Sequence, residues 1–103
     1  MSESHERSDV VARAETPTGG TIVLTASAWS HISAEHPEIA AHLAAVVKTA
    51  AEPEVVAPDP RSGRRRHYRS DAGPSRWLRV IVDFNETPAR IVTAHAHRKE
   101  PPR

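Results

Sequence analysis

The fold is decided by residues 77–97, which read WLRVIVDFNETPARIVTAHAH. Two apolar segments rich in β-branched residues flank a short polar turn in this stretch, and that pattern predicts a pair of strands. We expect the strands at 76–84 and 89–97. Because side chains alternate between the two faces of a strand, the three polar residues Thr93, His95 and His97 should all point the same way.

The register between these strands decides on which face the histidines lie. Pairing residue 84 with residue 90 gives one apolar face for a helix to cover, made of Val80, Val82, Val92 and Ala94. The same register sets Thr93 opposite Ile81 and His95 opposite Arg79 on the other face. A slip of one residue would turn His95 towards the helix. Burying an unpaired imidazole costs free energy, so we predict the first register.

The remaining elements follow from local patterns. Residues 21–25 predict a strand, and Ser27 is a candidate cap for a short helix that carries Trp29 and Ile32. A stripe of apolar residues after Pro37 predicts a helix over 37–51. Further strands are expected at 54–57 and around 67–68. This order predicts an α+β fold, in which an N-terminal short strand and the helices pack on one face of an antiparallel sheet of about four strands.

Length and composition bound the organisation of the chain. Its 103 residues fit a single domain, expected over 17–98, between a flexible polar tail over 1–16 and a disordered C-terminal tail over 99–103. There is no cysteine, which excludes disulfides and thiolate metal sites. No apolar run is long enough to span a bilayer and the N-terminus has no apolar signal segment, so we expect a cytoplasmic protein without a membrane partner.

Charge is unevenly distributed along the chain. Residues 1–60 hold three Lys/Arg against nine acids, a net charge of −6, whereas residues 61–103 hold eleven against four, a net charge of +7. An anionic ligand would be attracted to the C-terminal half. The alternative is that the two charges complement each other within the fold, with an acidic helix lying on a basic sheet.

Several short motifs together resemble a known group of proteins. They are WSHI at 29–32, HPEI at 36–39, PEV at 53–55, RHYR at 66–69, WLRVIV at 77–82 and IVTA at 91–94. Their order over residues 21–97 resembles the small phage and bacterial proteins of the Barnase–EndoU–Colicin–RelE superfamily. The resemblance implies helices packed on a four-stranded antiparallel sheet, and metal-independent RNA cleavage on the open face of that sheet.

The resemblance also suggests roles for individual residues. His31 matches the helical histidine, Tyr68 and Arg66 match the basic strand, and Thr93 matches the Val-Thr-Ala motif. His95 departs from the pattern, because relatives often have an aromatic residue there, and its candidacy rests on its own chemistry.

Cleavage of RNA without a metal needs a base, an acid and cations around the phosphate. We predict a toxin-like endoribonuclease that uses the RNA 2′-hydroxyl as nucleophile and needs no cofactor. His31 and His95 are the acid and base candidates, with His97 as a further one. Arg66 and Arg79 are the candidates for binding phosphate, and Thr93 and Tyr68 for donating hydrogen bonds. The expected partners are RNA and an inhibitory protein.

Other interpretations stay open at this stage. His31 has a structural partner in Glu35, one helical turn away. His95 and His97 are also candidate metal ligands, with Asp83 on the neighbouring strand. The same fold also serves non-catalytic modules that bind nucleic acid or protein, or assembly modules that pair through an exposed sheet edge.

Overall fold

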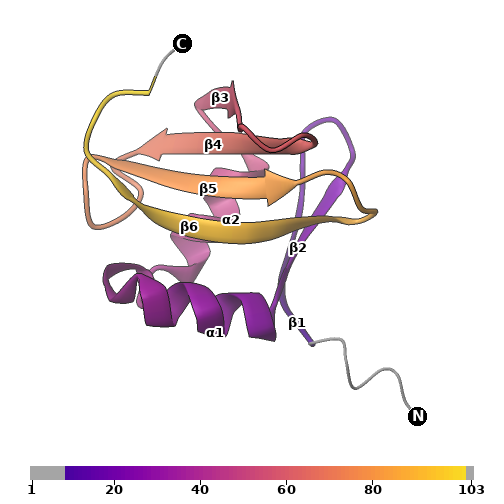
Figure 1. Ribbon diagram of the computed structural model, residues 1–103, viewed down its shortest axis with the longest axis horizontal. Coiled ribbons are helices and arrows are strands. Elements are labelled where there is room, and N and C mark those ends of the chain that lie inside the picture. The colour runs from indigo at the N-terminus through magenta and orange to yellow at the C-terminus, as the bar shows by residue number, and fades with distance from the viewer. Residues whose placement is uncertain (1–8, 102–103) are drawn as a thin grey trace.

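A computed structural model describes residues 9–101, and they form an α+β fold (Figure 1). The elements are β1 Val10–Glu15, β2 Thr21–Thr25, α1 Ala26–Glu35, the 3₁₀ helix η2 Pro37–Ile39, α2 Leu43–Ala51, β3 Val55–Pro58, β4 Arg64–Ser70, β5 Trp77–Asp83 and β6 Ala89–His97. One six-stranded sheet runs in the order β1-β2-β6-β5-β4-β3. Its neighbours are antiparallel except β2 and β6, which are parallel. The predicted class is confirmed, but the sheet is mixed and larger than expected.

The N-terminal hairpin accounts for the difference in size. Residues 10–15, expected within a flexible tail, form β1 and pair with β2. Their small residues Ala12 and Ala14 are half-buried, while the longer side chains between them are exposed. The first eight residues of the expected tail lie outside the described part of the chain. At the other end Pro101 is buried, which differs from the free tail expected over 99–103, and residues 102–103 also lie outside the description.

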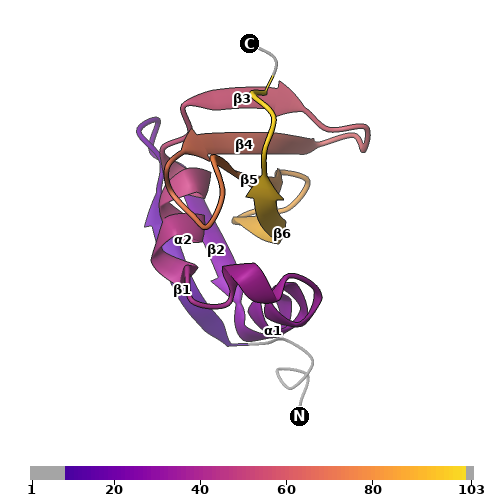
Figure 2. The same cartoon turned by 90° about the vertical axis from the view of Figure 1, so that its left-hand side faces the viewer.

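The helical region is divided differently from the prediction. Thr25, and not Ser27, caps α1, because its Oγ1 accepts a hydrogen bond of 3.1 Å from the amide of Ala28. The single helix expected over 37–51 is wrong, because η2 ends at Ile39 and α2 begins at Leu43. The turn between them leads the chain from η2, which contacts β6, to α2, which contacts β5 and β4 (Figure 2).

The main core lies between the helices and one face of the sheet. Its buried members are Ile22, Leu24, Ile32, Ile39, Val46, Ala50, Leu78, Val80, Val82, Ala89, Ile91 and Ala94. Because both helices contribute to this one cluster, they cover the same face. The opposite face, which we call the open face, has a smaller buried cluster of Val55, Tyr68 and Trp77.

A β-bulge changes the turn end of the predicted hairpin. Ile81 pairs with Thr93, but the next residue, Val82, pairs with Ile91, so Val92 is an extra residue in β6. The bulge turns Ile91 into the core in place of Val92, which corrects the predicted apolar face. Phe84 also lies outside the core, with 40% of its surface exposed.

Candidate active site on the open face

Pairing of β4, β5 and β6 brings most of the predicted site residues onto the open face. The predicted register is confirmed away from the turn, since Thr93 pairs with Ile81 and His95 with Arg79. Tyr68 pairs with Arg79 from the other side, and Arg66 pairs with Ile81. Two adjacent rows therefore cross the three strands, one made of Tyr68, Arg79 and His95, the other of Arg66, Ile81 and Thr93.

Arg79 is the central cation of this surface. Its Nε and Nη2 lie 2.9 Å and 2.7 Å from Nε2 of His95, and its Nη1 lies 3.4 Å from the Tyr68 hydroxyl. Its guanidinium carbon also lies 6.0 Å from the centre of the Tyr68 ring. No carboxylate of residues 9–101 pairs with Arg79. Its positive charge is thus held by neutral partners and is available to an anion.

His95, which contacts this arginine, lies between two further imidazoles. The rings of His36 and His95 are stacked with centroids 5.3 Å apart, and the ring of His97 meets that of His95 edge-on at 6.3 Å. His97 also lies 5.4 Å from the ring of Tyr68. We call the five residues His36, Tyr68, Arg79, His95 and His97 the imidazole cluster.

The environment favours the neutral form of two of these rings. Burial lowers the pKa of His95, and the charges of Arg79, His36 and His97 lower it further, while the hydrogen bond to the Ala96 carbonyl opposes them. Burial also lowers the pKa of His97, assisted by Arg79, Arg66 and Lys99. Both rings therefore remain neutral near neutral pH.

Arg66 and Thr93 lie one row away from Arg79. Arg66 donates from Nε to Oδ1 of Asp59 at 3.0 Å, so a carboxylate compensates its charge. This hydrogen bond is also the main reason that the pKa of the Arg66 guanidinium is raised. Thr93 is half-buried on the face that it shares with His95. Both residues flank the cluster, and Arg79 remains the less compensated cation.

His31 is the one predicted site residue that lies outside this group. Its side chain is 65% exposed on α1, and its Nε2 lies 3.4 Å from Oε2 of Glu35, the structural partner considered from the sequence. His36 reaches the cluster in its place. It lies at the corner between α1 and η2, with Nδ1 3.7 Å from Oε2 of Glu38. His36 reaches the cluster because its corner packs beside β6, whereas His31 does not. No local sequence pattern distinguishes the two histidines.

The alternative metal site has no support in the strand register. Asp83 is at the turn end of β5, where it pairs with Arg90, whereas the histidines lie towards the opposite end of β6. The Asp83 carboxylate instead accepts from the Asn85 amide at 2.8 Å and lies 3.5 Å from Nε of Arg64. Within residues 9–101 no three His, Cys, Asp or Glu side chains gather as metal ligands would.

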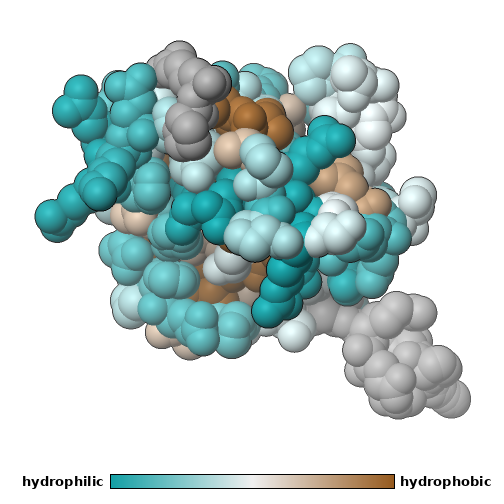
Figure 3. Space-filling model, turned by 45° about the horizontal axis from the view of Figure 1, so that its top comes forward, coloured by the Kyte–Doolittle hydropathy of each residue, from teal (hydrophilic) through white to brown (hydrophobic). Residues whose placement is uncertain are grey.

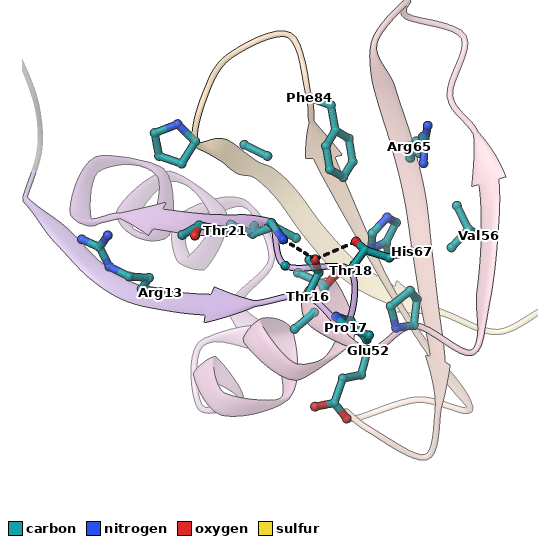
Figure 4. A pocket seen from close by; sticks show the side chains of 18 of the residues that line it. Arg13, Thr16, Pro17, Thr18, Thr21, Glu52, Val56, Arg65, His67 and Phe84 are labelled. Carbon is teal, nitrogen blue, oxygen red and sulfur yellow. Dashed lines mark hydrogen bonds between the residues drawn. The ribbon is translucent and has the colours of Figure 1, made fainter.

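The helix side of the sheet has a separate groove, about 1250 Å³ in volume (Figure 4). Figure 4 shows Arg65, Phe84 and His67 on one side of it and the turn at Thr16–Thr18 on the other. The Arg65 guanidinium lies 5.2 Å from the centre of the Phe84 ring. Nδ1 of His67 donates to the Ala50 carbonyl at 2.8 Å, so this imidazole fastens the end of α2 to β4. We regard the groove as secondary, because its histidine already has this structural partner.

The surface around these features is mostly hydrophilic. Figure 3 shows polar side chains over much of the face it presents, with hydrophobic patches that are small and separated. Over residues 9–101, none of the helices has the length and apolar character needed to cross a bilayer. Comparison of the chain with protein-family models and with curated proteins finds no match.

Proposed function

We propose that this chain is a metal-independent, toxin-like endoribonuclease that cleaves RNA by transesterification at the 2′-hydroxyl. The observation that supports the proposal best is Arg79, a half-buried cation that has no carboxylate partner among residues 9–101. It contacts His95 and the Tyr68 hydroxyl, and the rings of His36 and His97 lie on either side of His95. Phosphate is the natural ligand for a guanidinium in this state.

The reaction needs two proton transfers at one phosphate. A base takes the proton of the 2′-hydroxyl, its oxygen bonds to phosphorus, and the bond from phosphorus to the 5′-oxygen breaks. An acid delivers a proton to that leaving oxygen, so the products are a 2′,3′-cyclic phosphate and a 5′-hydroxyl. Proton transfer of this kind contributes roughly 10²–10⁴-fold in rate.

The cluster offers groups for each part of this reaction. His36 and His97 flank His95, and neither has both ring nitrogens engaged by other groups of residues 9–101. We assign the proton transfers to these two. Arg79, assisted by Arg66, would bind the phosphate and stabilise the charge that develops on it. Tyr68 and Thr93 would donate hydrogen bonds from the same face.

The test compares two histidines that are close in sequence. RNA is incubated with the full chain in excess EDTA, and the products are examined for 2′,3′-cyclic phosphate ends. His36→Ala should lower the rate at least a hundredfold, whereas the matched control His31→Ala should leave it unchanged. Absence of metal-resistant cleavage by the wild type, or equal rates for wild type and His36→Ala, would contradict the proposal.

A non-catalytic RNA-binding module is the competing proposal, and the uncompensated charge of Arg79 supports it as well. In that case the wild type would bind RNA with an affinity that falls steeply as salt is raised, and no product would form. The cleavage assay above separates the two proposals directly.

A further inference from the structure

We infer that His95 is a positioning residue, which orients Arg79 towards an anion without cancelling its charge and takes no part in proton transfer. The inference deepens the proposed function and rests on it. It reassigns the role expected for His95, because the hydrogen bonds around this ring leave no nitrogen for a substrate.

The tautomer of His95 follows from its two partners. A guanidinium only donates hydrogen bonds and remains protonated in proteins. Because Nε and Nη2 of Arg79 lie 2.9 Å and 2.7 Å from Nε2 of His95, that nitrogen must be the acceptor. The proton is therefore on Nδ1, which lies 3.0 Å from the carbonyl oxygen of Ala96, also an acceptor. Both ring nitrogens are engaged within the protein.

The same bonds fix the orientation of Arg79. One edge of its guanidinium faces His95 on β6, and Nη1 faces the Tyr68 hydroxyl on β4 at 3.4 Å. Partners on both neighbouring strands thus restrict the rotamers of Arg79 before a ligand binds. Binding therefore costs less side-chain entropy.

The choice of an imidazole as partner has an electrostatic consequence. A carboxylate at position 95 would also accept from Arg79, but it would neutralise the guanidinium, as Asp59 does for Arg66. A neutral imidazole leaves the full positive charge for the ligand. The charged and titratable groups facing His95 are Arg79, His36 and His97, and with burial they all favour its neutral form.

Three substitutions at position 95 separate positioning from proton transfer. His95→Gln places a neutral acceptor near the position of Nε2 but cannot exchange protons near neutral pH. His95→Ala removes the acceptor, and His95→Glu supplies a charged one. The probe is a short RNA with 2′-O-methyl riboses, which keeps its phosphates but cannot be cleaved, and its Kd is measured by fluorescence anisotropy.

We expect His95→Gln to bind this probe within about threefold of the wild type, and both His95→Ala and His95→Glu to bind it about tenfold more weakly. Cleavage of unmodified RNA should follow the same order. The ¹⁵N spectrum of the full chain near neutral pH should show His95 protonated on Nδ1 and unprotonated on Nε2.

The outcomes distinguish this inference from the proposed function. If His95→Gln binds the probe normally but cleaves as poorly as His95→Ala, then His95 transfers a proton and the inference is overturned while the ribonuclease proposal stands. A spectrum with the proton on Nε2 would overturn it too. If the wild type does not cleave but the order of affinities and the tautomer are as expected, the inference is upheld and the ribonuclease proposal fails.

Discussion

The buried imidazole of His67 should make the stability of the protein sensitive to mild acid. Burial lowers the pKa of His67 and the charge of Arg65 lowers it further, against the opposing effect of the hydrogen bond to Ala50. In the unfolded chain this pKa returns to about 6.5. Below that pH the unfolded state binds a proton that the folded state does not, so stability is complete above pH 6.5 and declines as the pH falls.

The size of the effect follows from the unfolded state. At about pH 5.5, one unit below the unfolded pKa, protonation stabilises the unfolded chain by about 1.4 kcal/mol if the folded imidazole stays neutral. His67→Asn removes this titration, and its side-chain amide can still donate to the Ala50 carbonyl. Between about pH 7.5 and about pH 5.5 the wild type should therefore lose up to about 1.4 kcal/mol more of its free energy of unfolding than the variant does.

Urea unfolding at the two pH values measures this difference. The other histidines are present in both proteins, so their contributions cancel in the comparison. His31→Asn, on the exposed side of α1, is the control for loss of an imidazole as such. An equal loss of stability in wild type and His67→Asn would refute the reasoning, because it would mean that the folded ring takes up a proton as easily as the unfolded one.

Three further predictions concern packing, capping and charge. Leu78→Ala, at a fully buried position of the main core, should lower the free energy of unfolding by about 2–5 kcal/mol in urea unfolding, while Val56→Ala on the exposed side of β3 should cost much less. Thr25→Ala removes the N-cap of α1 and should cost about 1 kcal/mol in the same assay, and no loss would show that the bond to the Ala28 amide does not contribute. Arg79→Gln should reduce the salt dependence of RNA binding by about one counterion, whereas Arg65→Gln, on the opposite face of the sheet, should not, and a similar effect of both would place the RNA elsewhere.

Where alternation of side chains decided the structure, the sequence was sufficient. Residues 89–97 form the predicted strand, and the pairs between Thr93 and Ile81 and between His95 and Arg79 follow from keeping histidines out of the core. The bulge at Val92 could not be predicted from that rule, because Ile91 and Val92 are equally apolar and only packing selects between them. Strand β1 was missed because its two valines are exposed and the residues that alternate with exposed side chains, Ala12 and Ala14, are small and only half-buried.

The site was predicted only in part, and for a related reason. Tyr68, Arg79 and His95 belong to adjacent strands, so register alone brings them together. His36 joins them through the turn between α1 and η2, which places its ring over His95. The break at residues 40–42, in a segment with good helical propensity, shows the same tertiary influence, and such packing cannot be derived from local patterns.

The parallel contact between β2 and β6 has a consequence for how the protein folds. It joins Ile22 and Val23 to Ala89 and Arg90, which are far apart in the sequence, so forming it requires the closure of a long loop. The contacts between β1 and β2 and between β5 and β6 join neighbouring strands and close much shorter loops. We therefore expect the two hairpins to form first, and the contact between β2 and β6 to limit the rate of folding.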